Sequence, residues 1–279
     1  MKLFIRAHDL GVRNEQPIID RLAQCGIDGV QLVAYKAFDG IEYQPGSLTP
    51  QRAGELGAAL RAAGVEVALI GAYFNPVHSD SSKVERCKAV FRDYLDNALA
   101  LGCEAVGSET GSFNDDKWTY HPLNRTEEAL VRVADTFRGL CDHAAQRGVK
   151  VAIEGAAGHV CYDVATLQRA TEMIGRDNLD IIFDIYNYLD AGNCRQYKEI
   201  LTDGIATFGK RIRCWHIKDC VMGGEKPVQV PVGKGELDFE FIFSAIKAHD
   251  PDARLVLEGT TGDDVPASAA FVRQVWDRV

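Results

Sequence analysis

The fold is decided by four short stretches of sequence, which are Val151-Ala152-Ile153-Glu154, Ile181-Ile182-Phe183-Asp184, Cys214-Trp215-His216 and Leu255-Val256-Leu257-Glu258. Each is an apolar run that ends in a carboxylate or an imidazole. Continuous apolar runs of this length are typical of strands buried on both faces, as in parallel sheets covered by helices. The second half of the chain is therefore expected to hold parallel strands, each with a polar residue at its carboxyl end.

Similar runs recur along the whole chain and alternate with stretches of helical periodicity. The apolar runs cover residues 3–6, 30–33, 65–70, 105–106, 149–153, 179–183, 212–217 and 255–257. Helical spacing of apolar residues lies at 18–25, 53–63, 84–101, 130–144, 167–174 and 242–246. Eight such units close most simply into a barrel, so the predicted fold class is α/β, a single (β/α)₈ TIM barrel. A doubly wound open sheet is the alternative, but no GxGxxG motif follows the first strand.

Composition narrows the classes of protein that remain. No linker or low-complexity segment interrupts the 279 residues, so we expect residues 1–279 to form one domain. The net charge of −9 argues against a nucleic-acid partner. The amino-terminal apolar stretch is too short for a signal peptide, and no run reaches the roughly 18 residues of a membrane span, so a cytoplasmic protein without a membrane partner is expected. The eight cysteines form no CxxC pair and are interpreted as reduced packing residues.

The four polar residues that end the late strands predict a metal site. In a closed barrel neighbouring strand ends converge, so Glu154, Asp184, His216 and Glu258 should point into a common cavity. Three carboxylates and one imidazole suit Mg²⁺, Mn²⁺ or Co²⁺, and also Zn²⁺. Taken singly, each residue has an alternative interpretation as a strand-terminal polar group that meets solvent or caps a helix.

With these residues in view, the sequence resembles the sugar phosphate isomerase/epimerase superfamily. That superfamily shares its barrel with xylose isomerase and includes the ketose 3-epimerases, hydroxypyruvate isomerase and inosose dehydratase. The resemblance covers essentially the whole chain. It is carried by Val151–Glu154, His159-Val160, Phe183-Asp184-Ile185-Tyr186-Asn187, Trp215-His216-Ile217-Lys218-Asp219, Pro231–Gly235 through Asp238-Phe239, and Leu257-Glu258-Gly259.

The resemblance implies a site and a reaction. Glu154, Asp184, His216 and Glu258 would hold one divalent cation that binds two neighbouring oxygens of a sugar. Glu154 and Glu258 would then be the catalytic pair, one removing a proton from a sugar carbon and the other returning it, through a metal-stabilised enediolate. The chemistry is reasonable by itself, because a cation that takes up oxyanion charge acidifies a neighbouring C–H bond.

Five further polar residues near the strand ends are candidate substrate contacts: His78, Glu109, His159, Asn187 and Lys218. The two histidines have an alternative interpretation as exposed or capping residues. Lys218 has an alternative as an ion-pair partner of Asp219. Asn187 departs from many ketose 3-epimerases, which are similar in having a histidine near this position, so the resemblance gives no support to ketose 3-epimerisation in particular.

Several functions are compatible with this pattern. The first is a metal-dependent isomerase or epimerase acting on a free or phosphorylated small sugar. A lyase or dehydratase acting on a keto-sugar or inosose would use the same site. An abasic-site endonuclease shares the barrel but needs more histidines and two or three metals. A non-catalytic barrel would be expected to have lost a ligand. The expected partner is a small carbohydrate, and pairing of identical chains is left open.

Overall fold

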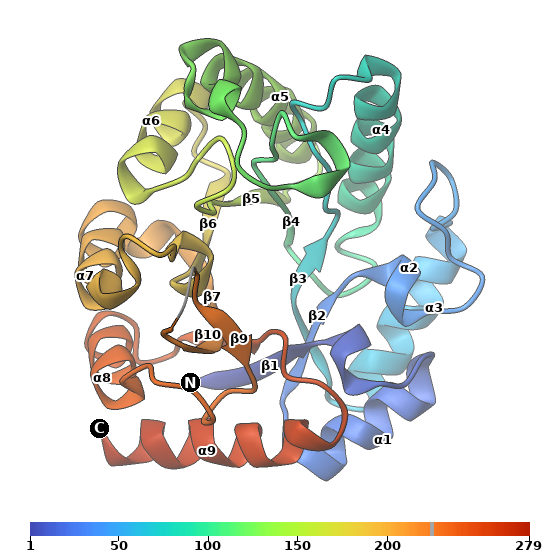
Figure 1. The fold of residues 1–279 in the computed structure, drawn as a ribbon. Coiled ribbons are helices and arrows are strands. Elements are labelled where there is room, and N and C mark those ends of the chain that lie inside the picture. The colour runs from blue at the N-terminus through green and yellow to red at the C-terminus, as the bar shows by residue number, and fades with distance from the viewer. Residues whose placement is uncertain (224–225) are drawn as a thin grey trace.

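The computed structural model describes residues 1–223 and 226–279 and forms a closed parallel barrel (Figure 1). Neighbouring strands follow the order β1-β10-β7-β6-β5-β4-β3-β2, with β2 paired to β1. The barrel strands are β1 (Lys2–Arg6), β2 (Gly29–Leu32), β3 (Glu66–Gly71), β4 (Ala105–Glu109), β5 (Lys150–Glu154), β6 (Leu179–Asp184), β7 (Ile212–Ile217) and β10 (Arg254–Leu257). The predicted α/β fold class, a (β/α)₈ TIM barrel, is confirmed.

Helices form a ring around the barrel (Figure 1). They are α1 (Glu15–Cys25), α2 (Ala34–Ala37), α3 (Pro50–Ala62), α4 (Ser81–Asn97), α5 (Glu127–Ala145), α6 (Val164–Ile174), α7 (Tyr197–Phe208), α8 (Phe239–His249) and α9 (Val265–Arg278). Side-chain oxygens of Thr49, Asp80, Thr126, Asp163 and Asp238 accept backbone N–H bonds at the starts of five of them. These caps satisfy donors that a helix leaves free in its first turn. No helix among the described residues is long and apolar enough to span a membrane.

The barrel interior is filled by apolar side chains. A separate buried cluster lies inside it, made of Phe4, Ala68, Leu69, Ala105, Ala152, Ile182, Cys214 and Val256. The lumen is therefore a packed core, as in other barrels of this size, and no pore runs through it. Polar chemistry is confined to the ends of the strands.

Helices α2, α7 and α9 and strands β8 and β9 were not among the elements predicted from the sequence. In α7 a glycine, Gly204, occupies a contact position where a Cβ would overlap the ring of Phe183, and this glycine weakens the apolar periodicity. Helix α9 begins at Val265, has Pro266 in its first turn and contains three alanines, and these features weaken the apolar periodicity in the same way. Strands β8 (Asp219–Val221) and β9 (Val228–Val230) form a short antiparallel ribbon outside the barrel.

Strand β4 continues further than its predicted two-residue core and ends at Glu109. The long loop after it is anchored by Asn75. The Asn75 side-chain amide donates to the carbonyls of Ser112 (2.6 Å) and Asp115 (3.0 Å), and its oxygen accepts from the Ser112 backbone N–H (3.1 Å). A Cβ at Gly111 would overlap this amide. The loop is held beside the end of β3, and its interpretation as an active-site lid stays a prediction.

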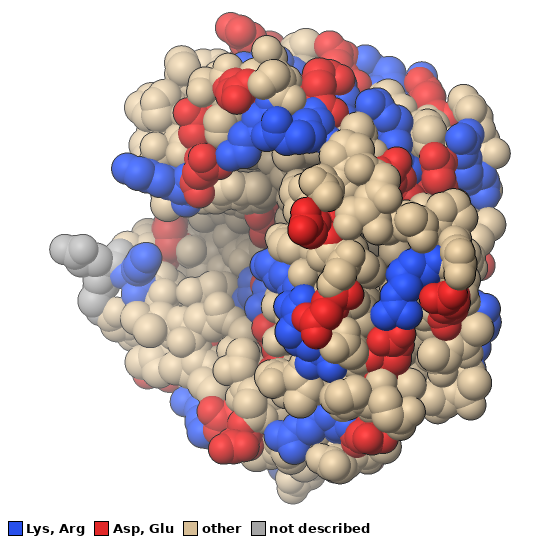
Figure 2. Space-filling model, turned by 90° about the vertical axis from the view of Figure 1, so that its right-hand side faces the viewer, with Lys and Arg blue, Asp and Glu red and all other residues tan. Residues whose placement is uncertain are grey.

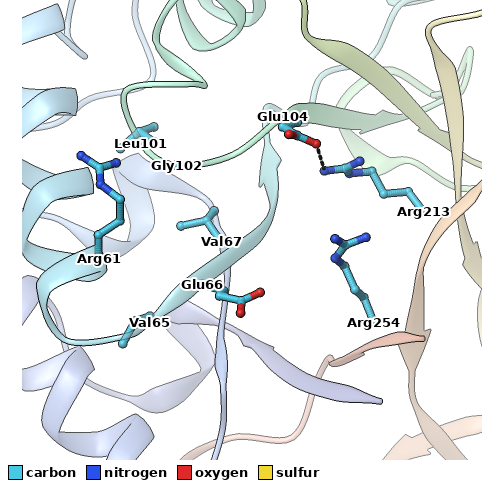
Figure 3. A pocket seen from close by; sticks show the side chains of 9 residues that line it. All are labelled: Arg61, Val65, Glu66, Val67, Leu101, Gly102, Glu104, Arg213 and Arg254. Carbon is cyan, nitrogen blue, oxygen red and sulfur yellow. Dashed lines mark ion pairs between the residues drawn. The ribbon is translucent and has the colours of Figure 1, made fainter. Parts of the chain in front are cut away.

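A cavity of about 300 Å³ lies at the amino-terminal end of the strands (Figure 3). Arg213 and Arg254, which lie near the starts of β7 and β10, line it together with Glu66 and Glu104. The Arg213 and Glu104 side chains are 4.0 Å apart. In TIM barrels this end of the strands serves stability, whereas active sites lie at the carboxyl ends. The chemistry of this barrel is therefore expected at the opposite end.

Two glycines of α3 provide a test of helix packing. A Cβ at Gly57 would overlap the carbonyl oxygen of Ala100, whereas a Cβ at Gly54 would meet open space. We expect Gly57→Ala to lower the free energy of unfolding by about 1–3 kcal/mol, because the backbone after α4 must move. The control Gly54→Ala should raise it by about 0.5–1 kcal/mol through helix propensity. Urea unfolding measures both, and similar values for the two variants would contradict the close approach.

Candidate metal centre

Four side chains from neighbouring strands meet at the carboxyl end of the barrel. Glu154 ends β5, Asp184 ends β6, His216 lies in β7, and Glu258 directly follows β10. The register places Asp184 and Val256 on either side of His216. One ligand atom from each of the four lies within 4.8 Å of the other three. We call Glu154, Asp184, His216 and Glu258 the quartet; no other group of His, Cys, Asp or Glu in the described residues has this spacing.

The quartet has the chemistry of a site for a divalent cation. Glu154, Asp184 and His216 are buried, and the Glu258 side chain is 12% exposed. The Oδ2 atom of Asp184 is buried, and Lys218 Nζ lies 2.9 Å from it. Three carboxylates this close together repel one another unless positive charge compensates them. Because one imidazole and three oxygen donors match the preferences of Mg²⁺, Mn²⁺, Co²⁺ and Zn²⁺, the residues present fit one such cation.

His216 faces the carboxylates with one ring nitrogen and the barrel interior with the other. Its Nδ1 lies 2.8 Å from Glu258 Oε2 and 3.1 Å from Glu154 Oε1. Its Nε2 lies 2.7 Å from the side-chain oxygen of Gln31. Nδ1 is therefore the nitrogen positioned to bind a cation.

Lys218 brings a positive charge to the quartet. Its Nζ lies 2.9 Å from both Asp184 Oδ2 and Glu258 Oε1, and it donates to Asn187 Oδ1 at 2.8 Å. The Asn187 amide in turn donates to Glu154 Oε1 at 2.8 Å. The structure thus brings two of the predicted substrate residues, Lys218 and Asn187, into direct contact with the quartet.

The alternative pairing of Lys218 with Asp219 is wrong. Asp219 points away from the quartet and accepts backbone N–H bonds from Gly233 (3.0 Å) and Gly235 (2.8 Å). A Cβ at Gly235 would overlap this carboxylate, so the glycine is required by the turn. The Gly233-Lys234-Gly235 segment is held by this turn before α8.

Arg6 is a functional residue that the sequence analysis missed. Its guanidinium donates to Glu258 Oε1 at 2.8 Å and to both oxygens of Asp9 at 2.8 and 3.1 Å. Asp9 also accepts the backbone N–H of Gly259 at 3.1 Å. These bonds fix the Glu258 segment against β1. The sequence contained a signal for this position, because Arg6 ends an apolar run just as the quartet residues do.

The two glutamates of the quartet have opposite pKa shifts. Burial by itself disfavours ionisation of Glu258, but Lys218 and His216 outweigh it and hold its pKa well below the usual value. Burial raises the pKa of Glu154, and the carboxylates of Glu258 and Glu109 add to the effect while His216 opposes it. Pairs of carboxyl groups with such divergent environments are typical of acid–base sites.

Glu109 and His159 lie beside the quartet. Glu109 pairs in register with Glu154, and burial raises its pKa to about 7. His159 is buried, with Nε2 3.9 Å from Glu109 Oε2 and its ring edge-on to Trp118 at 5.5 Å. Trp118 adopts a left-handed backbone conformation with φ of 53°. Non-glycine residues seldom adopt this conformation, and those that do are frequent at functional sites.

His78 lies apart from the quartet. Its Nδ1 accepts the backbone N–H of Asp80 at 2.9 Å, next to the start of α4, and its Nε2 lies 3.4 Å from Asp116. Lys83 also pairs with Asp116. Among the described residues no hydrogen bond or ion pair joins His78 to the quartet. Its role in substrate binding stays a prediction.

His159 provides a test of burial at this end of the barrel. Burial lowers its pKa from 6.5 to about 4, so the folded protein binds a proton less readily than the unfolded chain. Stability from this residue is complete above pH 6.5 and is lost as the pH falls toward 4, by about 3 kcal/mol in all. The destabilisation caused by His159→Asn should shrink by that amount between pH 7 and pH 4 in urea titrations. An equal difference at both pH values would contradict a neutral, buried imidazole.

The surface around the site carries charges of both signs. Figure 2 shows a hollow at the left of the view, with acidic and basic side chains around it. On this face Lys and Arg are interspersed with Asp and Glu, and the described residues present no continuous basic band.

The chain matches a family model over residues 19–275, nearly its full length, and the model describes a xylose isomerase-like TIM barrel. The chain belongs to this family. The resemblance to sugar isomerases and epimerases is thereby confirmed at the level of the family. No curated protein matches this sequence.

Solved structures with the same barrel include proteins with different reactions. A D-tagatose 3-epimerase-like protein is 19% identical, with a TM-score of 0.76 over 100% of this chain and 98% of that one. The probable 3-DHS dehydratase AsbF from Bacillus anthracis is 14% identical, with a TM-score of 0.75 over 98% and 99%. The IolI protein with a bound zinc atom is 16% identical, with a TM-score of 0.72 over 100% and 96%. At these identities the likeness concerns the fold.

Proposed function

We propose that the protein is a divalent-metal-dependent isomerase or epimerase of a small sugar or sugar phosphate. The observation that carries the proposal is the quartet, in which three carboxylates, two of them buried, and one buried imidazole from neighbouring strands converge. The site lies where barrel enzymes place their catalytic residues. The epimerases among the similar structures support a carbohydrate substrate.

The proposed reaction moves one proton between carbon and protein. When bound, the cation supplies a Lewis acid that makes the C–H bond next to a sugar carbonyl more acidic. One of the two glutamates, Glu154 or Glu258, would remove this proton, and the other would return a proton to carbon. No atom is lost, so the product is an isomer of the substrate.

Neighbouring residues would bind and orient the sugar. Lys218 and Asn187 present an ammonium and an amide next to both glutamates. Glu109 and His159 are positioned to meet hydroxyl groups from the side of β4 and β5. Trp118, whose ring packs against His159, would help to keep water away from the reacting carbon.

The cation itself is proposed as Mn²⁺, Mg²⁺, Co²⁺ or Zn²⁺. Three carboxylates favour the harder ions, whereas the imidazole also suits zinc. The zinc atom of the IolI protein supports a site for a cation of this class in the same barrel.

A lyase or dehydratase is a second candidate because Lys218 offers an acid beside Glu258. Its ammonium lies 2.9 Å from Glu258 Oε1, where it could protonate a departing hydroxyl after the carboxylate has removed a neighbouring proton. Hydroxyl plus proton leave as water, so the product is one water lighter than the substrate. The dehydratase among the similar structures supports this candidate.

The experiment that tests the proposal uses metal-loaded protein and a panel of free and phosphorylated ketoses and aldoses in D₂O. We expect deuterium at the carbon next to the carbonyl of at least one sugar, together with an isomer or epimer, both visible by proton NMR. A product that has lost water would move the assignment to the lyase. Absence of exchange and of any product across the panel, with metal bound, would contradict proton transfer at this site.

A further inference from the structure

Gln31 is a polar residue in a part of the barrel where apolar residues are the rule. It lies in β2 between Val30 and Leu32 and is fully buried. An amide that is removed from water without hydrogen bonds destabilises the folded protein. Its presence therefore has to be explained by the groups that it contacts.

Gln31 joins a tyrosine to the histidine of the quartet. Its Nε2 donates to the hydroxyl of Tyr73 at 2.6 Å, and its Oε1 lies 2.7 Å from His216 Nε2. A side-chain amide oxygen only accepts hydrogen bonds. The imidazole nitrogen that faces it must therefore carry a proton, so Nδ1, which faces Glu154 and Glu258, is the nitrogen that a cation would bind.

The orientation of the Gln31 side-chain amide decides which ring nitrogen of His216 is free to bind a cation. An amide turned by 180° would donate to Nε2 and place the ring proton on Nδ1, where it would prevent cation binding. Burial together with Glu154, Glu258 and Glu109 keeps the pKa of Tyr73 well above its usual value, so the phenol retains its proton. The phenol oxygen accepts from the Gln31 amide nitrogen at 2.6 Å, which places the amide oxygen on the side of His216.

The backbone is adapted to place this pair. The pairing of β2 with β3 shifts register between Val30 and Gln31, and such bulges re-aim a side chain. Strand β3 ends at Gly71, where a Cβ would lie 2.5 Å from the Tyr73 ring. The missing side chain at Gly71 leaves room for Tyr73 to turn back toward β2.

We propose that Gln31, oriented by Tyr73, is a positioning residue that fixes His216 with its proton on Nε2 and its lone pair on Nδ1, directed at the metal site. This inference rests on the proposed metal-dependent function. Groups that accept the second N–H of a metal-bound histidine change metal affinity by about 10- to 100-fold. Gln31 contacts neither the cation nor the substrate and acts through His216.

The test compares three variants with the wild-type protein. Gln31→Leu removes the acceptor, and Gln31→Glu keeps an acceptor at the same place. Asn97→Leu is the matched control. Asn97 is a buried amide at the end of α4, and its Nδ2 donates to the backbone carbonyls of Leu48 and Asp93. Calorimetry measures the dissociation constant for Zn²⁺, and ¹⁵N NMR of Zn²⁺-loaded, histidine-labelled protein shows which ring nitrogen carries hydrogen. Thermal unfolding without metal measures stability separately.

We expect Gln31→Leu to weaken Zn²⁺ binding by about 10- to 100-fold and to lose the slowly exchanging Nε2–H signal. Gln31→Glu should keep the wild-type Zn²⁺ affinity and the Nε2–H signal. Asn97→Leu should lower stability without changing Zn²⁺ affinity. Unchanged Zn²⁺ affinity in Gln31→Leu, or a spectrum of the wild-type protein with the proton on Nδ1, would overturn this inference but not the proposed function. Wild-type protein that binds none of the four cations would overturn the proposed function and this inference with it.

Discussion

Glu154→Gln and Glu258→Gln are each expected to slow exchange of the substrate's α-proton with solvent deuterium by about 10²- to 10⁴-fold, the usual contribution of a positioned acid or base. An amide keeps the shape of the carboxyl group but neither removes nor returns a proton at neutral pH. Because an epimerase uses one group on each face of the sugar carbon, loss of either one stops net conversion. Proton NMR in D₂O on the substrate found in the panel measures the rate.

The same two variants lose a ligand as well as a proton carrier, so the measurement needs a control for metal. Each variant is assayed at a cation concentration that saturates it, as judged by calorimetry. Asn187→Ala is the companion variant, because it removes a contact of Glu154 without changing a carboxylate. Exchange at the wild-type rate in either saturated glutamine variant would remove that glutamate from proton transfer.

Metal loading is expected to raise the free energy of unfolding by about 4 kcal/mol when the free cation is 1,000 times its dissociation constant. For a chain of this size that corresponds to an increase in Tm of about 10 °C. The physical reason is that the folded protein gathers three carboxylates and one imidazole, an arrangement that the unfolded chain lacks. Calorimetric scans with and without Mn²⁺ measure the difference.

Asp184→Asn is the control for this effect. The amide retains the volume of the side chain and its contact with the Asn187 backbone, but it removes the negative charge and one of the two buried carboxylate oxygens. We expect the metal-dependent increase in Tm to disappear. An equal increase in the variant would place the bound cation somewhere other than the quartet.

The sequence predicted the strands of the barrel well because their signal is local. Runs such as Val151–Glu154 and Ile181–Asp184 are apolar throughout, and their polar ends mark where each strand leaves the core. Once eight such runs are assumed to close into a barrel, convergence of the quartet follows from geometry. The extent of the domain over residues 1–279 stays a prediction.

Residues that support the quartet were harder to predict, because their roles depend on contacts between distant strands. Arg6 reaches Glu258 across the β1–β10 pairing, over a separation of 252 residues. Gln31 reaches His216 across the barrel, and nothing in the local sequence of β2 indicates this partner. Lys218 was a candidate, but its partners Asp184 and Glu258 come from other strands, whereas the adjacent Asp219 serves a turn.

His78 is a further case in which the partners of a predicted site residue could not be predicted from the local sequence. A histidine shortly after β3 lies in the part of a barrel where substrate contacts are common, yet its ring accepts the backbone N–H of Asp80 and faces Asp116. The alternative of a histidine that satisfies backbone groups describes what the structure shows. Only the fold of the loop that follows β4 brings Asp116 to this ring.

The central claim is that the quartet holds one divalent cation, and the most direct test is the metal content of the purified chain. Wild-type protein and Asp184→Asn are each loaded with Mn²⁺, dialysed, and measured by elemental analysis. We predict close to one metal per chain in the wild type and a loss of most of it in Asp184→Asn. Two or three metals per chain, or none after loading, would contradict the claim.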